Sequence, residues 1–156
     1  MILKYLIYSF SITFCSFIIG MIITALIKNT KIYNHELSNL NFIKSEKLNS
    51  ILGVSLIRWI VKNTFFKFLN PTLKFDRKSN ITEIQNIRKL MTKAEIDHLI
   101  AFCFVFILII ILALKAQFTF ALILLIFNIL MNLCPSLLQQ QNKRRIDNII
   151  SRFKKI

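Results

Sequence analysis

The amino-acid sequence predicts an all-α membrane protein with three transmembrane helices, an N-terminal anchor and a C-terminal helical hairpin, joined by cytoplasmic helices that are amphipathic or interfacial. Hydrophobic residues make up 55% of the 156 positions and gather in three uncharged blocks, and a bilayer span needs about 20 such residues. The chain has two glycines and two prolines, so a helix has few points at which it must break. Lysine and arginine number 21 against seven acids, an excess that suits anionic lipid as a partner better than nucleic acid.

The first block predicts a membrane anchor over residues 1–27. No charged residue occurs in residues 5–27, and Lys4 and Lys28 bracket this stretch. A secretory signal peptide has a shorter apolar core and a cleavage site of small residues. This block is longer than such a core, and it has no good cleavage site. We therefore expect a plain anchor that stays in the mature protein.

The other two blocks, residues 99–114 and 118–138, predict a transmembrane hairpin over residues 99–138. Only Lys115, Ala116 and Gln117 separate them, which is enough to turn between antiparallel helices but not to hold a domain. The block 99–114 is short for a span. We expect it to borrow a turn from the residues before it, which brings Glu95 and His98 to the membrane surface.

The distribution of positive charge predicts the orientation. All lysines and arginines except Lys4 and Lys115 lie in the middle segment 28–98 or in the tail 139–156, and basic segments stay in the cytoplasm. We therefore expect a multi-pass protein of the cell membrane with its N-terminus outside and its C-terminus in the cytoplasm.

Within the basic middle segment, residues 51–69 predict an amphipathic helix that ends before Asn70 and Pro71, because proline disfavours helical dihedrals in the residue before it. Trp59 lies at the boundary of its apolar face, and tryptophan and lysine both favour the membrane interface. An interfacial helix is therefore preferred over a core helix packed on the spans. The polar face of this helix consists of Ser55, Arg58 and Lys62.

Residues 80–98 predict a second helix that runs directly into the span 99–114. Asn80 is a capping residue with Glu83 three positions later, as in a capping box. One apolar stripe at helical spacing consists of Ile81, Ile84, Ile87, Met91 and Ala94.

Glu95 and His98 form a candidate catalytic pair on this helix. They are three residues apart, so their side chains are neighbours. A carboxylate can orient a histidine and raise its basicity, as in the deprotonation of a hydroxyl during acyl transfer. The alternative is a solvated helix end with no chemical role.

The third span carries amides that need partners inside a membrane. Asn128, Asn132 and Gln139 lie near one helix face, which should look inward because amides in hydrocarbon are costly. Pro135 lacks an N–H and so frees the carbonyl of Met131 for a neighbouring polar group. This face is either packing between helices or one wall of a site at headgroup depth.

A polar and basic stretch follows this span, with Asn142, Lys143 and Arg145 among its residues. Such a cluster can hold the phosphates of an acyl carrier or anchor the chain to anionic lipid. The sequence has no G-x-S-x-G elbow, Walker loop, H-E-x-x-H or glycine-rich nucleotide loop, so hydrolase, ATPase and zinc-protease functions are not supported. Three free, buried thiols are expected inside the apolar blocks, at Cys15, Cys103 and Cys134.

Several motifs together resemble those of the glycosyl-4,4'-diaponeurosporenoate acyltransferases, small membrane enzymes of staphyloxanthin-type carotenoid biosynthesis. The first is Met91-x-x-Ala94-Glu95-x-x-His98, which precedes the hairpin. The second is Asn128-x-x-x-Asn132-x-x-Pro135-x-x-x-Gln139-x-x-Asn142-Lys143-x-Arg145. A weaker likeness is Gly53-Val54 with Arg58 and Trp59, and the whole covers roughly residues 46–150. The chain departs from the family in Gln140 and Gln141, where the family has Arg-Tyr, and in Lys143, where it has arginine.

The resemblance implies that a fatty acyl group moves onto a sugar hydroxyl of a glycosylated carotenoid acid, or of a related glycolipid, at the cytoplasmic face. It implies His98 as the base and Glu95 as the group that orients it, with acyl-CoA or an acyl carrier protein as the donor and no cofactor or metal. The alternative is a non-enzymatic membrane scaffold or assembly protein. The substrate-binding residues implied are Asn128, Asn132, Gln139, Asn142, Lys143 and Arg145.

Overall fold

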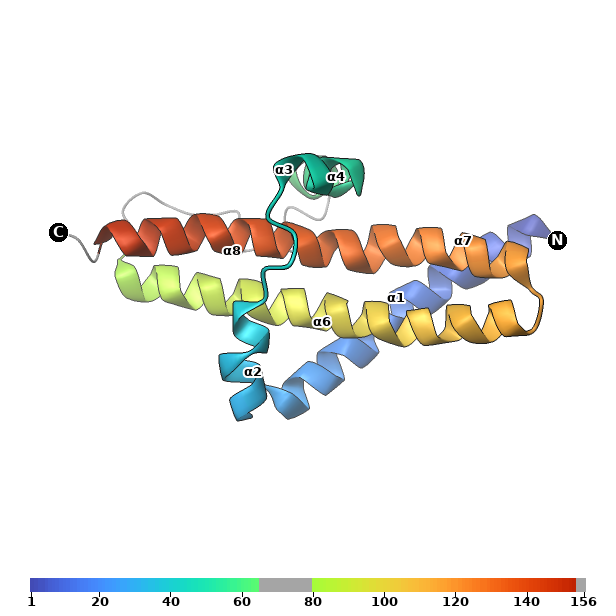
Figure 1. Ribbon diagram of the computed structural model, residues 1–156, viewed down its shortest axis with the longest axis horizontal. Coiled ribbons are helices and arrows are strands. Elements are labelled where there is room, and N and C mark those ends of the chain that lie inside the picture. Colours follow the sequence, from blue (N-terminus) through green and yellow to red (C-terminus); the bar gives the residue numbers. More distant parts are fainter. Residues whose placement is uncertain (65–79, 154–156) are drawn as a thin grey trace.

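Three long helices dominate the computed structural model, which describes residues 1–64 and 80–153 (Figure 1). The first is α1 (Ile2–Ile27) and the second is α6 (Ile81–Leu114). The third runs through α7 (Phe118–Asn128), the π-helical turn η3 (Ile129–Leu133) and α8 (Cys134–Phe153). Each is long and apolar enough to cross a membrane, so the predicted all-α fold with three spans is confirmed.

The helix α6 is continuous from its cap to the hairpin turn. The Asn80 side chain accepts a hydrogen bond from the Glu83 N–H at 2.9 Å, which confirms the predicted cap, and no break occurs at His98. At 1.5 Å per residue, its 34 residues extend about 51 Å, well beyond a hydrocarbon core of about 30 Å. The hairpin therefore has an apolar half beside its turn and a second half, here named the basic end, where α6 begins and α8 ends.

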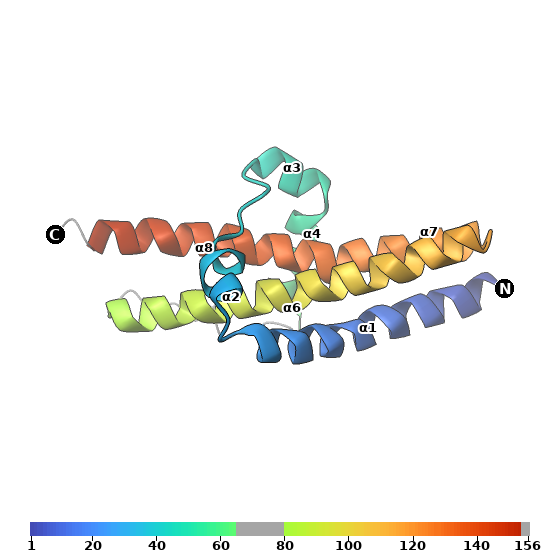
Figure 2. The ribbon, with the colours of Figure 1, turned by 60° about the horizontal axis from the view of Figure 1, so that its bottom comes forward.

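The helix α1 crosses α6, and the N-terminus of the chain lies at the same end of the bundle as the α6–α7 turn (Figures 1 and 2). Gly20 permits this close approach, because a Cβ atom at that position would lie 2.0 Å from the carbonyl oxygen of Asp97. The prediction of a plain anchor is therefore wrong in one respect, since α1 has a dedicated packing face. That face consists of small residues, namely Ser9, Thr13, Ser16, Gly20 and Thr24.

Apolar contacts hold the hairpin together at both ends. Near the turn, Val105 and Leu124 are fully buried and pack with Ile109 and Ala121. At the basic end, the predicted stripe on α6 meets the last turns of α8, where Ile84 and Met91 pack against Ile146. Of the three cysteines, Cys134 is buried as predicted, whereas the prediction was wrong for Cys15 and Cys103, whose side chains are exposed on the helix surface.

The middle segment forms α2 (Lys31–His35), η1 (Leu37–Asn39), α3 (Glu46–Ile51) and α4 (Val54–Asn63). The single helix predicted over residues 51–69 is therefore divided, because Gly53 has a φ of 87° that only glycine adopts without strain. The α4 helix ends at Asn63, and the predicted stop at Asn70 and Pro71 lies outside the described residues.

The helix α4 packs one face on α8 and leaves the other face open (Figure 2). Val54 is buried against Cys134, Leu137 and Leu138. Arg58, expected on the polar outer face, instead donates a hydrogen bond to Gln141 Oε1 on α8. The residues left exposed on α3 and α4 include Leu48, Ile51, Leu56 and Trp59.

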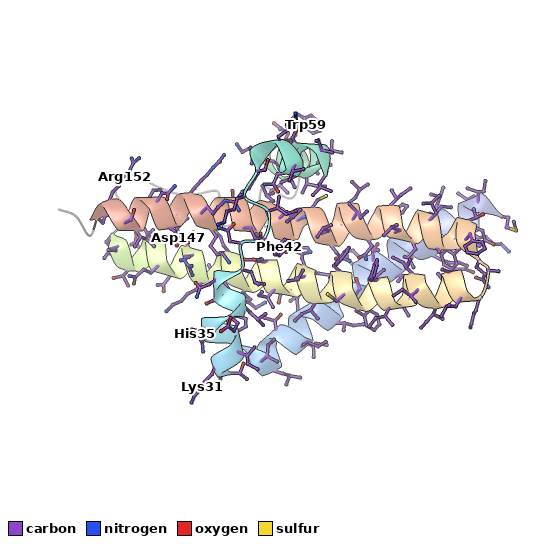
Figure 3. The ribbon with its side chains drawn as sticks, in the orientation of Figure 1. Lys31, His35, Phe42, Trp59, Asp147 and Arg152 are labelled. Carbon is purple, nitrogen blue, oxygen red and sulfur yellow. The ribbon has the colours of Figure 1, made fainter. Side chains whose placement is uncertain are left out.

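The open face predicts that Trp59 lies in the headgroup layer of the bilayer. The side chain is 61% exposed and points away from the bundle (Figure 3), and it is the only tryptophan of the chain. In vesicles with lipids brominated at different depths, we expect its fluorescence to be quenched most by bromines next to the headgroup.

The matched control is the double variant Trp59→Phe/Ile107→Trp, because Ile107 is 58% exposed in the middle of the apolar block of α6. Its fluorescence should be quenched most by bromines near the bilayer centre. A Trp59 signal that no brominated lipid quenches would show that α4 stands in water, and quenching like that of the control would place α4 inside the span.

Candidate functional site

Several of the polar residues predicted from the sequence meet where α1, α6 and the η3–α8 junction pack together. The turn of α6 that holds Glu95 and His98 lies opposite η3 and the first half of α8. On the third side, the ring of Phe17 from α1 stacks on the imidazole of His98, with 4.5 Å between the ring centroids. Three segments far apart in the chain therefore enclose this histidine.

The π-helical turn η3 places a backbone carbonyl beside His98. Pro135 has no N–H to donate to Met131, and the chain instead forms a wider turn in which the N–H of Cys134 bonds to the carbonyl of Ile129. The Met131 backbone and the Asn132 side chain both interact with the imidazole of His98. The prediction that a neighbouring polar group uses the carbonyl of Met131 is thus supported, and π-helical turns are frequent at functional sites.

The two asparagines of the third span face inward, as predicted. Asn128 donates a hydrogen bond to the carbonyl of Phe102 at 3.1 Å. Asn132 Nδ2 donates to Asn128 Oδ1 at 2.9 Å and to Ser16 Oγ at 3.1 Å. These bonds tie α7 and η3 to both other spans, and they hold the Asn132 amide next to His98.

Glu95 forms a buried ion pair with Lys143, and this pair links α6 to α8. The Lys143 Nζ atom lies 2.5 Å from Glu95 Oε2 and 3.0 Å from the carbonyl oxygen of Ser38. The structure does not show Glu95 orienting His98, since the other oxygen, Glu95 Oε1, and His98 Nδ1 both have no hydrogen-bond partner within the described ranges. Lys143 is turned toward the inside of the bundle, so its ammonium group does not face the solution, where the phosphates of an acyl donor would be.

Tyr33 on α2, which was not predicted as a site residue, lies near Asp97 and Glu95 of α6. Its ring is buried although α2 belongs to a polar, lysine-rich segment. Burial raises the pKa of the Tyr33 phenol, and the negative charges of Asp97 and Glu95 raise it further. An aromatic residue in a short polar helix was the only signal in the sequence that pointed to this contact.

Buried polar atoms without partners accumulate in this part of the described structure. A buried polar group that lacks a hydrogen bond costs about 1–3 kcal/mol, so this concentration makes this part of the described structure the candidate binding site. The acidic residues contribute Glu95 Oε1 and Asp97 Oδ1. The others are His98 Nδ1, Asn132 Oδ1, Ser136 Oγ, Gln139 Oε1 and both amide atoms of Gln140.

Comparison with known proteins identifies the family. A model of the family described as glycosyl-4,4'-diaponeurosporenoate acyltransferase matches residues 29–152. This chain belongs to the glycosyl-4,4'-diaponeurosporenoate acyltransferase family. No curated protein and no solved structure gave a match.

The match places the chain among the acyltransferases of carotenoid biosynthesis. The matched range contains all polar residues of α6 and α8 named above, and it begins after α1 has ended at Ile27. In this glycosyl-4,4'-diaponeurosporenoate acyltransferase homologue, the residues of α6, η3 and α8 around His98 thus lie inside the matched range. The contacts from α1 come from outside it.

The remaining predicted site residues lie toward the surface of the basic end. Asn142 is half-buried, and Arg145 is exposed on α8. Arg144, which the sequence analysis did not single out, holds the segment before α3 by donating to Asn41 Oδ1 at 2.6 Å and to the Ile43 carbonyl at 3.1 Å. Arg145 is therefore the predicted basic residue that faces outward, while its neighbours serve the fold.

Proposed function

We propose that this chain transfers a fatty acyl group from a thioester donor to a sugar hydroxyl of a glycosylated carotenoid acid or a related glycolipid. The family supplies the reaction class. The single observation that carries the proposal is His98, which has a buried Nδ1 atom without a partner among the described residues and stands amid other unpaired polar atoms. The basic segments around it favour the cytoplasmic face of the membrane as the place of reaction.

The proposed role of His98 is that of the general base. Met131 and Asn132 interact with its ring, and Nδ1, which has no hydrogen-bond partner among the described residues, is the nitrogen that we propose takes the proton. The sugar hydroxyl loses its proton to Nδ1 as its oxygen attacks the thioester carbonyl. The ester C–O bond forms, the C–S bond breaks, and the proton passes from His98 to the departing thiolate.

The unpaired amides beside His98 suit the acceptor and the oxyanion. Ser136 Oγ is a buried donor without a partner in the described chain, and the Gln140 amide lies beside the Glu95 carboxylate. Donors of this kind stabilise the negative oxygen of a tetrahedral intermediate. Gln139 Oε1 is an acceptor that can bind a sugar hydroxyl, and the Asn132 side chain stands at the imidazole of His98. Asn128 acts indirectly, because its own hydrogen bonds hold Asn132.

The acyl donor is proposed to bind at the exposed part of the basic end. Acyl-CoA and acyl carrier proteins both present their thioester on a phosphopantetheine arm, and arginine suits phosphate recognition. Arg145 on α8 and Lys89 on α6 are exposed there, with Asn142 nearby in sequence. Lys143 has no part in donor binding, since it is paired with Glu95 inside the bundle.

The experiment that tests the proposal uses the purified chain in vesicles with a long-chain acyl-CoA and two acceptors, a glycosylated carotenoid acid and the same acid without its sugar. We expect mass spectrometry to find an added fatty acyl group on the glycosylated acceptor alone. A scaffold would leave both acceptors unchanged with acyl-CoA and with acyl carrier protein, and acylation of the acid without its sugar would contradict the assigned acceptor.

A further inference from the structure

The first helix makes three separate contacts with the polar cluster around His98, although it lies outside the residues matched to the family. All three contacts come from one face of α1, at Ser16, Phe17 and Gly20. A helix that served only to anchor the chain would have no reason to direct its polar and small residues toward this cluster.

The contact of Phe17 with His98 is the most specific. The two rings lie 4.5 Å apart between centroids with an angle of 26° between their planes. Aromatic rings at this spacing attract one another by about 0.5–1.5 kcal/mol beyond the area they bury. The stack therefore sets the plane of the imidazole and covers one of its two faces.

The contacts on either side hold α1 at the distance that this stack requires. Ser16 Oγ donates to the Thr13 carbonyl at 2.7 Å and accepts from Asn132 Nδ2 at 3.1 Å. Gly20 lies against the carbonyl of Asp97, where any side chain would force the helices apart. Ser16 and Gly20 thus fix the position of α1 one residue before Phe17 and one turn after it.

We propose that α1 is a wall of the catalytic site and that Phe17 is the residue that positions His98. The inference rests on the proposed role of His98 as the base. Phe17 holds the ring so that Nδ1 is directed at the acceptor hydroxyl, and it excludes water and lipid from one face of the ring. Phe17 itself does not react.

The test compares Phe17→Leu with Phe14→Leu, the same substitution on the same helix at a side chain that is 59% exposed. The first readout is chemical modification of the two histidines by diethyl pyrocarbonate, measured by mass spectrometry. The exposed His35 serves as the reference within each molecule. We expect His98 to react several-fold faster relative to His35 in Phe17→Leu and at the wild-type rate in Phe14→Leu.

The second readout is acyl transfer. In Phe17→Leu we expect kcat to fall about tenfold or more with little change in KM for the acceptor, because a misplaced base weakens the chemical step rather than binding. Phe17→Tyr keeps the aromatic ring and should restore both the wild-type kcat and the slow modification of His98.

Three outcomes separate this inference from the proposed function and from a role in packing. Wild-type modification of His98 and wild-type kcat in Phe17→Leu would overturn the role of Phe17. A second outcome is that His98 becomes more reactive in Phe17→Leu while the Phe17→Leu and His98→Gln variants both keep full activity. Phe17 would then cover His98 as described, but His98 would not be the base, and both the proposed mechanism and this inference would be wrong. A Phe17→Leu protein that unfolds at a lower temperature than Phe17→Tyr, with unchanged His98 reactivity, would show a role in packing alone.

Discussion

Acyl transfer should fall at least about a hundredfold when His98 is replaced by glutamine, since a positioned general base contributes roughly 10²–10⁴-fold to such a reaction. Glutamine is similar in length and can hydrogen-bond to Met131 and Asn132, but it cannot take the proton of the sugar hydroxyl. The measurement is the rate of ester formation per molecule of folded protein in vesicles, together with the thermal unfolding midpoint of the variant.

The matched control is His35→Gln, which changes the only other histidine of the chain. His35 is exposed on α2 and pairs with Glu36 at its surface, so this variant should keep the wild-type rate. A His98→Gln enzyme with full activity would show that the catalytic base lies elsewhere, and equal losses in both variants would indicate a general sensitivity to histidine replacement.

The second large effect is expected on stability. Replacing Lys143 by methionine leaves the carboxylate of Glu95 buried without its partner, and breaking a buried ion pair by removing one member typically costs about 3–5 kcal/mol. The structure gives Glu95 no exposed surface and leaves Lys143 almost none, so water cannot replace the lost contact. The measurement is the unfolding midpoint in detergent micelles, compared with that of the wild type.

The chain supplies a control of the same kind in Arg88 and Asp147, a pair that also joins α6 to α8. These side chains are partly exposed, and exposed pairs contribute about 0–1 kcal/mol, so Asp147→Asn should change the midpoint little. The double variant Glu95→Leu/Lys143→Leu should regain much of the lost stability, since apolar residues can replace a buried pair. If Lys143→Met were no less stable than Asp147→Asn, the ion pair would contribute no more than a surface contact.

The structure also changes the part assigned to Glu95. On a helix, residues three apart are neighbours, and the sequence offered Glu95 as a group that could orient His98. The carboxylate instead turns toward the ammonium group of Lys143, because an unpaired charge inside the bundle costs far more than a neutral imidazole nitrogen without a partner. His98 is positioned by groups from η3 and α1.

The features that depend on local pattern could be predicted from the sequence. The long uncharged blocks indicated the three spans, the side chain of Asn80 capped α6 where predicted, and the amides Asn128 and Asn132 face inward. The freed carbonyl of Met131 beside Pro135 was likewise a local consequence of a missing N–H. Each of these depends on residues of one continuous segment of the chain.

Which helix faces meet depends on how the three long helices pack, and no local pattern predicted it. Phe17 meets His98, Tyr33 lies near Asp97 and Glu95, and Arg58 bonds to Gln141, all between segments widely separated in the sequence. Such pairs depend on the rotation of each helix and on the register between helices, which the wider turn η3 shifts within the third helix. A pattern of apolar residues predicts which face of a helix is buried, but the partner of that face depends on how the spans pack. Gly20 allows α1 to approach α6 closely at this site.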